Sequence, residues 1–136
     1  MLLLLDSRDR VNSTEDPATC KFRLVPPIDN IRKITLHSFD LPIPDDAQDE
    51  GTFYIVIEEF GYHVRGCDNQ DSGTFVVFRE TEAGTRTPIY DNNTFHQSFE
   101  IPPRSISEIN LRVAYRNASS ETIVLGGDFN MLLNIE

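Results

Sequence analysis

The chain has 136 residues, of which 12 are basic and 22 acidic, for a formal net charge of −10. This length suits a single domain that buries about two-thirds of its unfolded surface. Because binding to phosphate backbones depends on Lys and Arg, the acidic balance argues against nucleic acid as a partner. The two cysteines, Cys20 and Cys67, are too few for a disulfide scaffold and lack metal-knuckle spacing, and the alternation around Cys20 predicts a buried, inert side chain.

The opening MLLLL is too short for the apolar region of a signal peptide and runs directly into charged residues. We therefore expect no secretion by that route. No later apolar run approaches the roughly 20 residues that cross a bilayer, so we also expect no membrane span.

Apolar residues alternate with polar ones along most of the chain, in short runs separated by Gly, Pro, Asn and Asp clusters, which is typical of β-strands. The pattern predicts strands at residues 2–5, 19–25, 31–39, 52–59, 73–80, 94–101, 107–115, 121–125 and 129–135. Residues 52–59 and 73–80 are apolar on both faces, which indicates strands covered on two sides or placed at a subunit contact. The proline pairs at 26–27 and 102–103 are expected to end strand pairing.

No segment has a helical repeat of apolar positions. Eight or nine short strands in a chain of this size predict an all-β protein, an antiparallel β-sandwich occupying residues 1–136 as one domain. Residues 1–18 are expected to form an N-terminal strand and arm. A single jelly roll of about eight strands is the favoured architecture. An immunoglobulin-like sandwich is the alternative, although the chain lacks the Trp and paired cysteines of that fold.

The string GGDFN, residues 126–130, looks like a signature of metal-dependent nucleases of the endonuclease/exonuclease/phosphatase family. That resemblance implies a long α/β sandwich that supplies further Glu, Asp, Asn and His residues to a metal ion and a phosphate. Only six residues follow Asn130 and no helices are predicted, so we interpret Gly126, Gly127 and Asp128 as a hairpin turn between two strands.

Other candidates for chemistry have equally plain interpretations. The acidic stretch 45–50 has oxygen ligands for calcium, but its spacing fits no EF-hand, and we expect a solvated loop. His37, His63 and His96 stand on separate segments, and no Ser or Cys has the surroundings of a nucleophile elbow. The glycosylation patterns at Asn12, Asn92 and Asn117 are expected to be polar turns. We therefore expect no catalytic residues, no metal, no cofactor and no enzymatic activity.

The most unusual stretch is DSRDR, which consists of Asp6, Ser7, Arg8, Asp9 and Arg10. Opposite charges this close have two interpretations. One is a turn in which carboxylates accept hydrogen bonds from guanidiniums of the same chain. The other is an arm that docks on an adjacent subunit, where bidentate Arg–carboxylate pairs fix geometry. The sequence leaves both open, and the five residues are our candidates for a subunit interface.

This opening resembles the start of small structural proteins of large or tailless double-stranded DNA viruses, in which a DSRDR string precedes a β-rich domain. The resemblance covers roughly the first 44 residues. It implies a penton or minor capsid protein, located in the capsid shell of a virion and acting by assembly. The expected partners are other copies of the chain, with a pentamer favoured, and a neighbouring major capsid protein.

Two alternatives come from other classes. The first is a carbohydrate- or receptor-binding β-sandwich of a virion spike or fibre, in which Tyr54, Tyr62, Tyr90 and Tyr115 would stack on sugars. The second is a small cupin-type hydrolase or isomerase, which needs clustered metal ligands such as His37 and His96.

Overall fold

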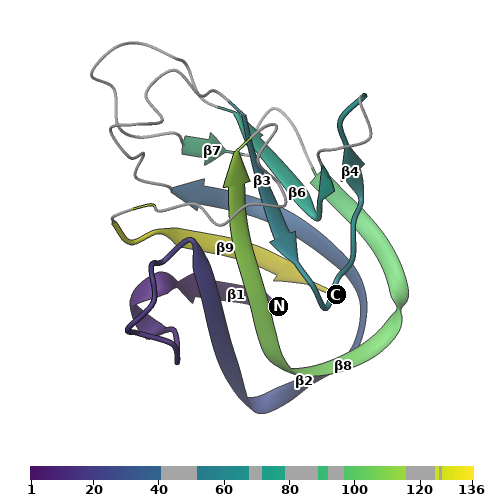
Figure 1. Ribbon diagram of the computed structural model, residues 1–136. Coiled ribbons are helices and arrows are strands. Elements are labelled where there is room, and N and C mark those ends of the chain that lie inside the picture. The colour runs from purple at the N-terminus through teal and green to yellow at the C-terminus, as the bar shows by residue number, and fades with distance from the viewer. Residues whose placement is uncertain (41–51, 68–71, 79–88, 92–96, 116–124, 126) are drawn as a thin grey trace.

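The computed structural model describes residues 1–40, 52–67, 72–78, 89–91, 97–115, 125 and 127–136 (Figure 1). Its strands are β1 (Leu2–Asp6), β2 (Thr19–Asp40), β3 (Thr52–Ile57), β4 (Val64–Arg65), β5 (Ser72–Gly73), β6 (Phe75–Phe78), β7 (Ile89–Asp91), β8 (Gln97–Tyr115) and β9 (Asn130–Ile135). One short 3-10 turn, η1 (Ser7–Asp9), follows β1. Every strand pair is antiparallel, which confirms the predicted all-β class. Within the described residues, no helix has the length and apolar character to cross a membrane.

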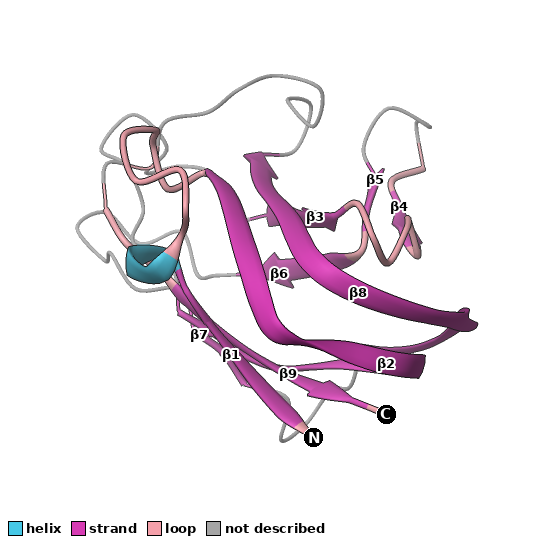
Figure 2. Ribbon diagram, turned by 90° about the horizontal axis from the view of Figure 1, so that it is seen from below, coloured by secondary structure: helices cyan, strands magenta, loops and turns pink. Residues whose placement is uncertain are grey.

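Strands β2 and β8 are unusually long, at 22 and 19 residues, because each one continues from one layer of the sandwich into the other. Residues 19–23 of β2 pair with 108–112 of β8, and residues 33–36 pair with 97–100. Between these two stretches the register shifts three times, and such bulges bend a strand. Figures 1 and 2 show the two strands curving together around one side of the molecule.

The proline pairs interrupt regular strand pairing, as predicted, but they do not end the strands. Pro26 and Pro27 lie inside β2, and Pro102 and Pro103 lie inside β8. All four fall between the two regularly paired stretches, where the bulged chain does not require a ladder hydrogen bond from every residue. Predicted strands 19–25 and 31–39 are therefore one strand, and the described part of 94–101 is continuous with 107–115.

The strand order confirms the predicted β-sandwich. One layer contains the first part of β2, the last part of β8, β3 and β6, in that order. The other layer contains β1, β9, the last part of β2 and the first part of β8, with β7 also paired to β2. In the first layer, strands distant in the sequence lie side by side, as in the Greek keys that make up a jelly roll.

The core lies between the two layers. Its largest fully buried side chains are Phe39, Phe53, Phe75, Phe129, Ile31, Ile34, Leu36, Ile55, Ile57, Ile109 and Leu111. The alternation predicted for β2 is confirmed, because Ile34 and Leu36 are buried while Lys33 and His37 are exposed. Residues 53–57 of β3 are all buried, as the apolar character of both faces predicted.

One predicted strand is divided in two. Residues 73–80 were expected to be continuous, but Thr74 separates β5 from β6. The buried Thr74 hydroxyl accepts a hydrogen bond from the Ile57 amide at 2.9 Å and lies 2.7 Å from the Gly61 carbonyl, to which it donates. The two short strands β4 and β7 were not predicted, and residues 121–124 of another predicted strand lie outside the described residues.

Candidate functional site

The first residue of the DSRDR string caps the 3-10 turn that follows β1. One Asp6 carboxylate oxygen accepts a hydrogen bond from the Arg8 amide at 2.9 Å. The Arg8 guanidinium also binds this carboxylate with Nε at 3.0 Å and a terminal nitrogen at 2.5 Å. These bonds to Arg8 lower the pKa of Asp6 below its ordinary value and raise that of Arg8. The pair thus holds the chain in a tight turn at the end of β1.

Ser7 is fully buried and joins the turn to the start of β9. Its Oγ donates to Asp128 Oδ1 at 2.8 Å and accepts from the Phe129 amide at 2.8 Å. The Ser7 amide donates to the Phe129 carbonyl at 3.0 Å. Phe129 in turn stacks on Phe39 in the core, with ring centroids 5.4 Å apart. Because the hydroxyl is enclosed and already bonded in both directions, Ser7 is a structural residue and not a nucleophile.

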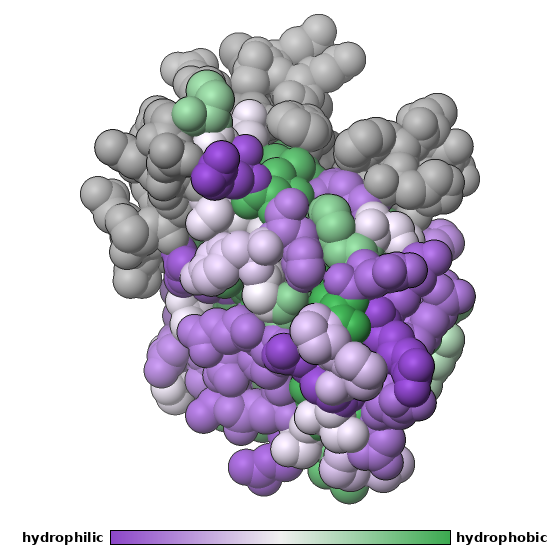
Figure 3. Space-filling view, turned by 90° about the vertical axis from the view of Figure 1, so that its right-hand side faces the viewer, coloured by the Kyte–Doolittle hydropathy of each residue, from purple (hydrophilic) through white to green (hydrophobic). Residues whose placement is uncertain are grey.

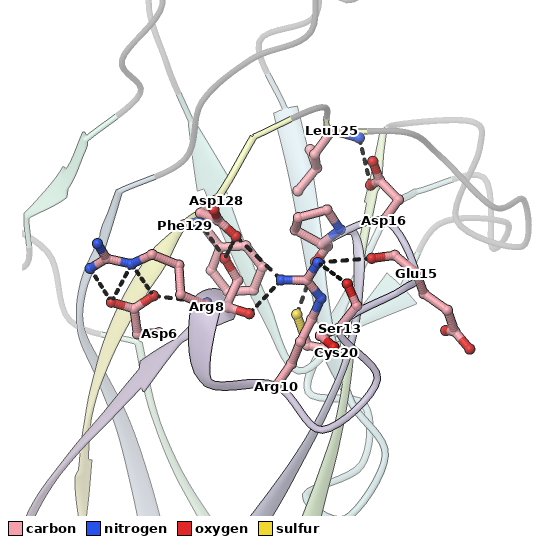
Figure 4. Close-up of polar contacts among 12 residues, drawn as sticks. Asp6, Arg8, Arg10, Ser13, Glu15, Asp16, Cys20, Leu125, Asp128 and Phe129 are labelled. Atoms are coloured by element: carbon pink, nitrogen blue, oxygen red, sulfur yellow. Dashed lines mark hydrogen bonds and ion pairs between the residues drawn. The ribbon is translucent and has the colours of Figure 1, made fainter.

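Arg10 binds three backbone carbonyls and one carboxylate (Figure 4). Its Nη1 donates to the Ser7 carbonyl at 2.6 Å and lies 3.3 Å from Asp128. Its Nη2 donates to the carbonyls of Ser13 and Glu15, at 3.3 and 2.9 Å. The buried Nε finds no acceptor among the described residues. Arg10 therefore fixes the loop that leads from η1 toward β2.

The two strings that the sequence singled out, DSRDR and GGDFN, form one cluster. Sequence reasoning did not find this, because their residues are more than a hundred positions apart and short motifs carry no information on distant pairing. The pairing of β1 with β9, with Asp6 opposite Asn130, brings them together. Asp128 accepts hydrogen bonds from Ser7 and Arg10. The hairpin turn predicted at residues 126–128 includes Gly126, which lies outside the described residues.

The structure contains the hydrogen bonds expected if DSRDR forms a turn within one chain, in which carboxylates accept from guanidiniums of the same chain. Asp6 and Ser7 are buried, and Arg10 is largely enclosed by its own loop. Arg8 and Asp9 are exposed, so two of the five candidate interface residues present charged groups outward. Of the predicted arm 1–18, residues 2–6 form β1, and the remainder contacts the body of the protein through bonds of Arg10 to Asp128 and of Asp16 to the Leu125 amide.

The histidines do not form a common site in the described part of the chain. His37 is exposed on β2. The His63 ring stacks on Phe99 at 4.7 Å, and its Nε2 donates to the Phe60 carbonyl at 2.7 Å. Among the described residues, no group of three or more His, Cys, Asp or Glu is placed to hold a metal ion. His96 and the acidic stretch 45–50 lie outside them.

Two titratable groups have pKa values shifted by burial. Cys20 is buried, as predicted, and its thiol donates to the Pro17 carbonyl at 3.0 Å. Burial raises the pKa of Cys20 to about 12. Burial also raises the pKa of Glu59, although this carboxylate accepts hydrogen bonds from the amide and the side chain of Asn110.

Of the tyrosines proposed to stack on sugars, the two whose side chains the structure describes do not form one platform. Tyr54 is buried in β3, whereas Tyr62 is exposed. The side chains of Tyr90 and Tyr115 lie outside the described part of the structure. Tyr54 is therefore not available to stack on a sugar in the glycan-binding alternative.

The exposed surface has a few large apolar side chains. The face shown in Figure 3 is mainly hydrophilic, with a narrow band of hydrophobic residues. The large hydrophobic side chains that are exposed include Leu2 and Leu4 on β1, and Val25 at the bend of β2. An open pocket of about 640 Å³ lies beside β1 and is lined by Leu3, Leu24, Val25 and Ile28, among others.

No protein-family model matches the chain, and a search of curated proteins gave no significant match.

Proposed function

We propose that the chain is a structural protein of a virion, the penton of a capsid vertex or a minor capsid protein, which acts through subunit contacts and not through catalysis. The observation that carries this proposal is the DSRDR opening of residues 6–10, with its resemblance to small structural proteins of double-stranded DNA viruses. The antiparallel β-sandwich supports it, because single jelly rolls serve as capsid domains.

The charge and the surface are compatible with this role. A net charge of −10 disfavours a position against the genome and suits the outer side of a shell. Closed rings form through contacts between unlike faces of identical subunits. Exposed apolar side chains outside β1, such as Val11 and Tyr62, are suited to such contacts.

Under this proposal, some residues of the DSRDR string shape the loop and others contact a neighbouring chain. Asp6, Ser7 and Arg10 hold the loop in shape from inside. Arg8, whose side chain is 68% exposed, and Asp9 face a neighbouring subunit or the major capsid protein. Arg8 is already oriented by Asp6, which reduces the side-chain entropy lost when a second carboxylate or a carbonyl binds it.

The test is the mass of the purified protein in solution, measured by light scattering over a range of concentration and salt, with electron microscopy of any ring. We expect a particle five times the mass of the chain. Arg8→Gln should raise the lowest concentration at which the ring persists. Arg65→Gln is the matched control, because it removes the same charge from another exposed arginine, on β4. A chain that stays monomeric at every concentration would contradict the ring.

A further inference from the structure

Two edges of the sheets are closed by carboxamide side chains that imitate a neighbouring strand. At β6, the Gln97 side chain accepts from the Val76 amide at 2.8 Å and donates to the Val76 carbonyl at 2.5 Å. At the start of β2, the Asn12 side chain accepts from the Lys21 amide at 2.9 Å and donates to the Thr19 carbonyl at 2.7 Å. Such capping blocks the backbone groups that would otherwise pair with another chain.

Strand β1 has no such cap among the described residues. It is the outermost strand of its layer and pairs with β9 alone. The Ile135 amide donates to the Met1 carbonyl, and the Ser7 amide donates to the Phe129 carbonyl. Because hydrogen-bonded pairs alternate along an antiparallel ladder, odd-numbered residues of β1 face β9. The backbone N–H and C=O groups of Leu2 and Leu4 therefore point away from the sheet.

The side chains at this edge are also apolar and exposed. Leu2 is 60% exposed and Leu4 is 61% exposed. Residues 2–5 are all leucine, without the charge or proline that commonly protects an edge strand. On its inward side, Leu3 lines the open pocket of about 640 Å³ together with the bend of β2, where Val25 is 83% exposed.

We propose that the β1 edge binds an extended apolar segment of another protein chain, which adds to the sheet as a further strand. Inward-facing residues of that segment would enter the pocket beside Leu3 and Val25, and outward-facing residues would lie next to Leu2 and Leu4. An added strand satisfies the free backbone groups, and its alternate side chains use the pocket, as in other strand-addition complexes.

The geometry points to an extended segment and not to a second folded copy. Stable interfaces between folded proteins involve roughly 20–30 residues on each side, far more than the short β1 edge offers. The charged side chains in the pocket lining are one of each sign, Arg23 and Asp29, and the remaining side chains are apolar, so a largely apolar segment fits.

The experiment measures binding of a fluorescein-labelled peptide in which four leucines alternate with threonines and lysines flank both ends. Fluorescence anisotropy reports the dissociation constant. Leu4→Pro removes the outward N–H of residue 4 and leaves the neighbouring bonds to β9 in place. Val25→Asp places a charge in the pocket at an exposed position that costs the fold little. We expect each variant to weaken binding at least tenfold.

The matched control is Val11→Asp, which makes the same change at another exposed valine that does not line this pocket. It should bind like the unaltered chain. Val25→Asp keeps the test decisive if Leu4→Pro does not fold. Failure of the unaltered chain to bind at millimolar peptide, or equal binding by the variants, would overturn the proposal. Dimers of the chain alone that Leu4→Pro abolishes would make a second copy the occupant and also overturn it.

This inference goes beyond the proposed capsid role and does not depend on it. A chain that is monomeric at every concentration but binds the peptide at β1 would support the edge site while contradicting the ring.

Discussion

Ser7 and Phe129 lie 122 positions apart and exchange two hydrogen bonds, from the Ser7 amide to the Phe129 carbonyl and from the Phe129 amide to Ser7 Oγ. The hydroxyl also donates to Asp128, so one buried side chain bonds to the two residues that precede β9. This arrangement connects an N-terminal turn directly to the core, because the Phe129 ring stacks on Phe39.

Replacing Ser7 with alanine should therefore destabilise the fold. The substitution leaves the buried Phe129 amide without its acceptor, and an unsatisfied buried group costs about 1–3 kcal/mol. Urea denaturation followed by circular dichroism measures the change. Ser13→Ala is the control, because that residue is exposed and uses its carbonyl in the contact with Arg10. Equal stability of the Ser7 and Ser13 variants would contradict the structural role of the hydroxyl.

The Asp6–Arg8 pair should make stability depend on acid. Bonds to Arg8 lower the folded-state pKa of Asp6 below its ordinary value of 3.8. A group with a lowered folded pKa stabilises the protein fully above its unfolded pKa, and that contribution is lost as the pH falls through the folded pKa. We expect Asp6→Asn to have a lower free energy of unfolding than the unaltered chain at pH 6. This difference in free energy should become smaller below pH 3.8. A constant difference in the free energy of unfolding across this pH range would contradict a contribution from the ionised Asp6 carboxylate.

Glu59 should change the pH dependence of stability in the direction opposite to Asp6. Burial raises its folded-state pKa above the ordinary value of 4.5, so its contribution is complete below that value and is lost as the pH rises through the folded pKa. Glu59→Gln keeps an oxygen to accept from Asn110 and removes the charge. Thermal melts at pH 4 and pH 8 should show the variant gaining stability only at the higher pH. Glu100→Gln is the control, because it removes a charge from an exposed carboxylate that does not contribute to the shift of Glu59.

Gln97 should be needed for the edge of β6. Gln97→Leu keeps a similar volume but removes both partners of Val76, and the loss of two buried hydrogen bonds should cost roughly 2–4 kcal/mol. Chemical denaturation measures this difference. Ser98→Ala, at the next and exposed position, should change stability by less than about 0.5 kcal/mol. Similar effects of the two substitutions would mean that the carboxamide does not cap the edge.

The two cysteines should differ in reactivity. Cys67 is exposed, whereas Cys20 is buried and has its pKa raised to about 12, which leaves almost no thiolate at neutral pH. Titration with a thiol reagent at pH 8 should modify one thiol quickly and the second only after denaturant is added. Mass mapping identifies the modified residue. Rapid modification of Cys20 in the folded protein would contradict its burial.

The sequence predicted the strand class and the inward residues well, because alternation records which face of a strand is buried. It predicted both ends of β1, β3 and β9 to within two residues. It did not predict the continuity of β2 and β8, because a proline pair in a bulge looks the same in sequence as one in a turn. The sequence also did not predict that DSRDR and GGDFN lie together in space, because this depends on the long-range pairing of β1 with β9.

The two long strands have a consequence for how the protein folds. Because β2 and β8 each belong to both layers, neither layer contains a complete set of strands that could form on its own. Their pairing joins residues 19–23 to 108–112, so it closes a loop that contains most of the chain, at a cost in chain entropy. Such a high contact order is associated with slow folding, in milliseconds to seconds.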